Sequence, residues 1–107
     1  MICNSYKIFF TTLADDTKLD IINLLSKGPK TVTEICEKLK LEQSRVSHNL
    51  KAMADRHFVK VKKVGKTRVY SLDEEYIVPI LKLIDEHVEH FYKNYCKCNG
   101  IPWRKRS

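Results

Sequence analysis

The sequence predicts a mainly α-helical domain of five helices with one β-hairpin. Two observations lead to this prediction. A helix, a short turn and a second helix follow one another over residues 31–53, and a hairpin pattern follows directly over residues 59–72. Helix, three- or four-residue turn, helix is the spacing of a helix-turn-helix. A hairpin placed directly after it makes the combination a winged helix-turn-helix.

The length of the chain limits the number of domains, and its charge indicates the kind of partner. The chain has 107 residues, enough for one domain, and a formal charge of +7. That charge favours a polyanionic partner, nucleic acid most simply, although a membrane surface or a ribosome would also attract it. The first residues lack a secretory signal pattern, and no apolar run approaches the roughly 18 residues of a membrane span. We therefore expect a cytoplasmic protein without a membrane partner.

The first two predicted helices differ in how their apolar residues are spread. Residues 6–14 form a short helix that is apolar around more of its circumference than one core face needs. The next helix can be capped by Asp15 or Asp16, and Gly28 with Pro29 ends it. Its predicted inward face consists of Leu19, Ile21, Ile22, Leu24 and Leu25.

The helix-turn-helix itself is predicted over residues 31–53. Val32, Ile35 and Leu39 share one face of its first helix, and Thr31 or Thr33 can cap it. The second helix is apolar only on the side of Val46, Leu50 and Met53. Its outward face is short, polar and cationic, which suits DNA base edges, because Arg can bind guanine and Gln can bind adenine by paired hydrogen bonds. The residues predicted to enter the major groove are Gln43, Ser44, Arg45, Ser47, His48 and Lys51.

Residues 59–72 alternate apolar and basic side chains around Gly65, which predicts an amphipathic β-hairpin. Its predicted outer face consists of Lys60, Lys62, Lys66 and Arg68. A basic hairpin beside such a helix is placed to touch DNA phosphate or the minor groove, and we assign that role to Lys62, Lys66 and Arg68. The alternative is a lysine-rich sheet edge that only opposes aggregation.

The last predicted helix covers residues 73–95, and its apolar positions form more than one stripe. A helix of this kind at the end of a small domain has to bury its second side on another surface. The expected surface is a second copy of the chain, with the first helix contributing. Two recognition helices could then enter successive major grooves of a palindromic double-stranded site. Because Pro79 lacks a backbone donor, the regular helix is expected to start near Glu75 or Tyr76.

The chain is expected to divide into a domain at residues 1–95 and a basic, cysteine-containing tail at residues 96–107. Glycine and proline interrupt this tail, which is typical of a disordered end. Trp103 among basic residues could instead lie along DNA or pack on the dimer.

With these residues in view, the chain resembles the ArsR/SmtB family of winged-helix transcriptional repressors over residues 5–95. Residues 10–25 are similar to the family's Leu-Ala-Asp-Pro-Thr-Arg-Leu segment, with Asp16 where proline is usual. Residues 43–51 are similar to its recognition helix, particularly in zinc-sensing members, and residues 64–72 to its wing. The resemblance implies a homodimer that blocks a promoter and is released by a ligand, usually a metal ion.

The resemblance also implies Glu74, His87 and His90 as candidate metal ligands, for zinc or another divalent ion. His87 and His90 are three residues apart and share a helical face. Glu74 lies 13 residues before His87, about 20 Å along an ideal helix, so a second subunit would have to supply it. Tyr76 stands where the family has histidine, and a phenol with a pKa of about 10 is a poor zinc ligand near neutral pH. Two exposed histidines without metal are the alternative.

Four cysteines offer a second candidate sensor. Cys3, Cys96 and Cys98 could form a thiolate site for a thiophilic metal ion or arsenite. Cys36 matches only the last position of the arsenic-sensing Cys-x-Cys-x-x-Cys motif, since Thr31 and Thr33 occupy the other two. A buried Cys36 with loose terminal thiols, or redox switching, are the other possibilities, and folding is expected to need no metal.

The two alternatives to a DNA-binding regulator are a protein-docking module and an enzyme. A winged helix can also serve as a protein-docking module, and binding to no duplex at moderate salt would favour that function. An enzyme is not expected, because no nucleophile, base or paired-carboxylate arrangement has a supporting motif, and the chain has only three glycines for a phosphate loop.

Overall fold

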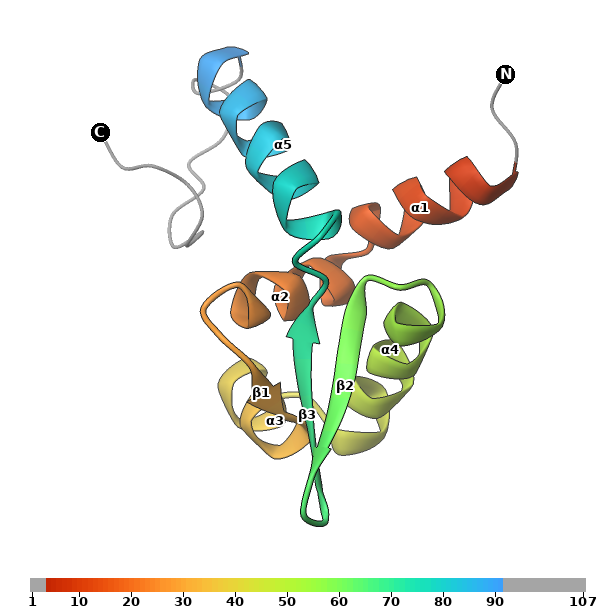
Figure 1. Ribbon diagram of the computed structural model, residues 1–107, viewed down its shortest axis with the longest axis vertical. Coiled ribbons are helices and arrows are strands. Elements are labelled where there is room, and N and C mark those ends of the chain that lie inside the picture. Colours follow the sequence, from red (N-terminus) through yellow and green to blue (C-terminus); the bar gives the residue numbers. More distant parts are fainter. Residues whose placement is uncertain (1–3, 92–107) are drawn as a thin grey trace.

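The computed structural model describes residues 4–91 and has the predicted five helices and hairpin within that range (Figure 1). The helix-turn-helix and the hairpin form the body, whereas the first and last helices project from it on the side away from the hairpin tip. The elements in order are α1 (Asn4–Ala14), α2 (Asp16–Leu25), β1 (Lys30–Thr31), α3 (Val32–Leu39), α4 (Gln43–Asp55), β2 (Val59–Val64), β3 (Thr67–Leu72) and α5 (Ile77–Phe91).

Side-chain caps fix the starts of α2 and α3. The Asp15 carboxylate accepts a hydrogen bond from the Lys18 N–H at 2.9 Å, so Asp15 is the cap of α2. Thr31 and Glu34 form a reciprocal capping box at α3. The hydrogen bond from the Thr31 backbone N–H lowers the pKa of Glu34, because it stabilises the carboxylate. Of the four predicted cap residues, Asp15 and Thr31 therefore cap.

The turn between α3 and α4 depends on one left-handed residue. Lys40 follows the end of α3 with φ 56° and ψ 47°, a conformation that usually belongs to glycine. Its backbone N–H still bonds the Cys36 carbonyl. This turn sets α4 across α3, and the predicted inward residues Val46, Leu50 and Met53 are fully buried.

A third strand joins the hairpin that the sequence predicts. The antiparallel sheet has the order β1, β3, β2, with Lys30 opposite Tyr70 and Thr31 opposite Val69. The two-residue strand β1 is too short to carry an alternating pattern, so the sequence did not predict it. It ties the start of α3 to the hairpin.

The core lies between α2, α3, α4 and the inner side of the sheet. Its largest fully buried side chains include Ile21, Ile22, Ile35 and Phe58. The predicted inward face of α2 is confirmed except at Leu19, which is 40% exposed because it lies on the side of the helix away from the core.

The last helix begins later than predicted. Asp73 accepts hydrogen bonds from the backbone N–H groups of Tyr76 and Ile77, and α5 starts at Ile77. These two bonds are the first causes of a lowered pKa for Asp73, with a further contribution from Lys60. Pro79 therefore sits in the first turn, where helical N–H groups have no partner anyway, and does not interrupt the helix. Residues 92–95 of the predicted helix lie outside the described range.

None of the helices within residues 4–91 is long and apolar enough to cross a membrane.

Candidate nucleic-acid interface

A groove of about 700 Å³ runs between α4 and the β2–β3 hairpin. From α4 it is lined by Gln43, Ser47 and Lys51, and from the hairpin by Lys66 and Arg68. All five side chains are exposed. Three cations therefore face one hollow together with a side-chain amide and a hydroxyl, a lining that can contact phosphates and base edges together.

The register of the hairpin separates the cations that the sequence placed on one face. Lys62 pairs with Val69, whereas Arg68 pairs with Lys63. Residues that pair directly share a face, and successive residues alternate faces, so Lys62 and Arg68 lie on opposite faces. The prediction of one outer face with Lys60, Lys62, Lys66 and Arg68 was therefore wrong. Lys63, which sequence reasoning missed, shares the face of Arg68.

The six predicted residues of the recognition helix α4 are all exposed. They do not all face the groove. Arg45 lies toward α2, and its guanidinium donates a hydrogen bond to the Thr17 hydroxyl at 2.8 Å. Because guanidinium has five N–H donors, this bond leaves donors for another acceptor. Ser44 and His48 are exposed without lining the groove.

Asn49 and Lys18 anchor α4 to α2. Asn49 is 8% exposed, and its amide nitrogen donates to the Arg45 carbonyl at 2.8 Å. The Lys18 ammonium donates to the Asn49 amide oxygen at 2.9 Å and lies 3.9 Å from the Asp15 carboxylate. Because both the oxygen and the nitrogen of this buried amide are hydrogen-bonded, they favour one orientation of α4 on α2. No local sequence pattern indicates this anchor, because its partners are 31 residues apart.

A second anchor joins α1 to the end of α4. Arg56, which caps the C-terminus of α4, donates from its guanidinium to the fully buried Thr12 hydroxyl at 2.8 Å. The Phe9 and Phe58 rings pack beside it with centroids 5.0 Å apart. The hydrogen bond from Arg56 to Thr12 thus holds α1 against the C-terminal end of α4.

Helices α1 and α5 project from the body (Figure 1). Both expose large apolar side chains. On α1, Tyr6 is 52% exposed and Phe10 56%, whereas on α5, Leu83 is 66% exposed and Phe91 70%. The inward side of α5 is buried at Ile77, Leu81 and Asp85. The two-sided character predicted for the last helix is confirmed within the described residues, whereas the burial of Asp85 was not predicted.

The candidate metal ligands are not assembled within one chain. Glu74 lies in the turn before α5, while His87 and His90 are exposed near its end. Their ring centroids lie 4.8 and 6.0 Å from that of Phe91. Within residues 4–91 no group of three or more His, Cys, Asp or Glu side chains could hold a metal ion.

The thiol candidates fall largely outside the described range. Cys36 is half-buried and forms no disulfide within that range. Cys3, Cys96 and Cys98 lie beyond residues 4–91, as does the predicted tail at 96–107.

Comparison with known proteins finds relatives among transcriptional regulators. The family model described as bacterial regulatory protein, arsR family, matches residues 15–61. A transcriptional repressor SmtB homolog from Synechocystis is 27% identical over 76% of this chain, which spans 61% of that relative's length. The arsenical resistance operon repressor of Staphylococcus xylosus is 31% identical over 76% of this chain and 81% of its own. The homodimeric winged helix-turn-helix DNA-binding domain of a possible ArsR-family regulator from Mycobacterium bovis superposes with a TM-score of 0.72 at 25% identity, covering 83% of this chain and 86% of that one.

Proposed function

This chain belongs to the arsR family of bacterial regulatory proteins, and from that premise we propose that it is a homodimeric DNA-binding repressor of transcription in the cytoplasm. The observation that supports DNA binding most directly is the groove, where polar and cationic side chains of α4 face Lys66 and Arg68 of the hairpin. A catalytic role is not part of the proposal, and the relatives are regulators.

In this proposal α4 enters the major groove and the hairpin follows the adjacent backbone or minor groove. The strand of phosphates that separates the two DNA grooves then lies along the protein groove, within reach of Lys51, Lys66 and Arg68. Side chains that face bases carry sequence information, whereas those on phosphates only position the protein. We assign the first role to Gln43, Ser44, Arg45, Ser47 and His48, and the second to Lys66 and Arg68, with Lys51 able to reach either. Lys62, for which the sequence predicted the second role, lies on the opposite face of the hairpin and is not assigned to it.

A comparison of Arg45→Ala with Lys66→Ala tests this division of roles. The DNA would be a duplex selected from a random pool, with scrambled duplex as the reference. Loss of a good base contact should cost about 1 to 3 kcal/mol on the selected duplex only, whereas loss of a wing cation should weaken both alike. Equal losses on both duplexes for Arg45→Ala would make Arg45 a phosphate contact. Absence of binding to any duplex at moderate salt would favour a protein-docking module.

We propose that the exposed apolar faces of α1 and α5 form the dimer interface. Large apolar patches on a small domain mark association surfaces, and the M. bovis domain is homodimeric. Light scattering on Leu83→Glu should report a monomer, because dimerisation would bury the glutamate carboxylate in the apolar interface at a high cost in free energy. Val64→Glu is the matched control, since Val64 is similarly exposed, at 57%, but lies on the hairpin. Dissociation by both variants, or by neither, would contradict this interface.

We further propose that a divalent metal ion binds at α5 and releases the repressor. His87 and His90 would hold it through imidazole nitrogens, with the partner subunit's Glu74 as a third ligand, and the ion would supply a positive charge that joins two subunits. The support is the donor chemistry and the helical spacing of the two histidines. The alternative ligand set is Cys3, Cys96 and Cys98, which suits a thiophilic ion.

Metal analysis of protein purified without chelator distinguishes these sites. Replacement of His87 and His90 by glutamine should remove the metal if the α5 site holds it, and replacement of Cys96 and Cys98 by serine should not. The reverse result would assign metal to the thiolates. Protein without metal that still binds duplex would be a regulator controlled by redox state or by no ligand.

A further inference from the structure

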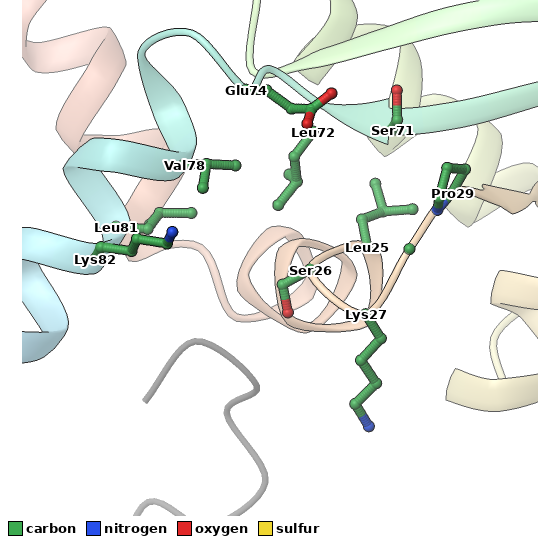
Figure 2. A pocket seen from close by; sticks show the side chains of 11 residues that line it. Leu25, Ser26, Lys27, Pro29, Ser71, Leu72, Glu74, Val78, Leu81 and Lys82 are labelled. Carbon is green, nitrogen blue, oxygen red and sulfur yellow. The ribbon is translucent and has the colours of Figure 1, made fainter. Parts of the chain in front are cut away.

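A second hollow, of about 400 Å³, lies where three elements meet: the end of α2, the end of β3 and the first turns of α5 (Figure 2). It is separate from the groove and shares no lining residue with it. Its size falls within the range of small-molecule sites.

One wall of this pocket is apolar, Ser26 and Ser71 also line it, and its rim carries charged side chains. Leu25, Leu72 and Leu81 line it and are otherwise core residues, exposed by only 3 to 5%. Figure 2 shows Leu25, Leu72 and Val78 pointing toward one another across the space. A ligand here would therefore contact the edge of the hydrophobic core.

Charged side chains at the rim restrict the kind of ligand. Lys82 supplies an ammonium group and Glu74 a carboxylate, and Lys27 also belongs to the lining. Lys27 points away from the space in Figure 2, while Lys82 extends from α5 beside Leu81. An acidic group can pair with Lys82, and a hydroxyl or amine can donate to Glu74. An inorganic anion would leave the apolar wall unused, and a purely apolar compound would leave the rim unused.

We propose that this pocket binds a small amphipathic organic anion, with its apolar body against Leu25, Leu72 and Val78 and its acidic group beside Lys82. The ligand would touch α2 and β3 of the DNA-reading body and α5 of the dimer interface at once. Beyond its buried residues Ile77, Leu81 and Asp85, α5 projects away from the body (Figure 1). Occupancy therefore favours one orientation of α5 over another, in proportion to the difference in affinity.

The regulatory half of this inference rests on the proposed function, whereas the binding half does not. Anilinonaphthalene sulfonate is a suitable anionic probe, and phenylnaphthylamine is its neutral counterpart. Methyl NMR should show shifts at Leu25, Leu72, Val78 and Leu81 on addition of the anion. This readout separates the pocket from the exposed faces of α1 and α5, which also attract aromatic dyes. Shifts confined to Leu83 and Ile84 would overturn the proposal.

Matched variants test the charge and the space separately. Lys82→Gln should weaken the anion about tenfold and the neutral probe less than about twofold, because only the anion loses a charge-assisted bond. Lys38→Gln is the control, since Lys38 is exposed on α3 and lines neither hollow. Val78→Phe, checked for folding by thermal unfolding, should block both probes. Equal affinity for Lys82→Gln and Lys38→Gln would refute the assigned ligand class.

DNA titrations with and without saturating anion test the regulatory half. Coupling between two sites typically changes affinity by about fivefold or more. A pocket that binds the probe without changing duplex affinity would refute regulation through α5. A protein that binds the probe but no duplex would refute the proposed function and leave the pocket in place.

Discussion

Replacement of Arg68 and of Lys62 by alanine tests the hairpin register through DNA binding. Both changes remove one exposed cation from adjacent strands, so they alter net charge equally. Only Arg68 lines the groove beside α4, because pairing of Lys62 with Val69 turns Lys62 to the other face. We therefore expect Arg68→Ala to remove a phosphate contact and Lys62→Ala to remove none in the groove.

The size of the effect follows from counterion release. Each lost phosphate contact lowers the slope of log affinity against log salt by about 0.9, or about 1.8 for a dimer. Between about 50 and 200 mM salt this amounts to about a tenfold smaller loss of affinity for Arg68→Ala than for the unmodified protein. Lys62→Ala should keep a slope close to that of the unmodified protein.

Fluorescence anisotropy with one labelled duplex at five or more salt concentrations measures the slopes. Light scattering checks that both variants keep the oligomeric state of the unmodified protein. Equal slope changes for the two variants would show that DNA does not distinguish the faces of the hairpin. A larger change for Lys62→Ala would place DNA on the other face and refute the groove as the phosphate site.

Three further predictions concern stability and the joints of the fold. Arg56→Ala should lower the free energy of unfolding by about 1 kcal/mol in urea titration, because the buried Thr12 hydroxyl loses a donor; no change would make the α1 anchor dispensable. Lys40→Gly should raise it by about 1 kcal/mol, since glycine adopts the left-handed turn without steric cost; a loss would refute that strain. The pKa of Asp73 is lowered by folding, so its charge stabilises the protein above the unfolded value near 3.8 and this contribution is lost as pH falls through the folded value. Asp73→Asn should therefore be less stable at neutral pH, with the difference shrinking below about pH 4, and a difference independent of pH would contradict this origin.

Sequence patterns predicted the elements because each pattern is local. Spacing at 3.6 residues identified Val46, Leu50 and Met53 as the inward face of α4, and all three are fully buried. Capping chemistry acts within four residues, which is why Asp15 and Thr31 could be anticipated. The start of α5 was placed too early, because the bonds that Asp73 makes to the turn hold residues 74–76 out of the helix.

The sequence by itself determined the order of helices and strands, the polar face of α4 and the basic character of the hairpin. Only the tertiary structure decided that Arg68 joins Gln43 and Ser47 at one groove while Lys62 does not. Alternation within a strand gives two faces, but the turn decides which faces of two strands coincide. The bonds of Arg45 to Thr17 and of Lys18 to Asn49 likewise join residues about 30 positions apart, and no local period encodes such contacts.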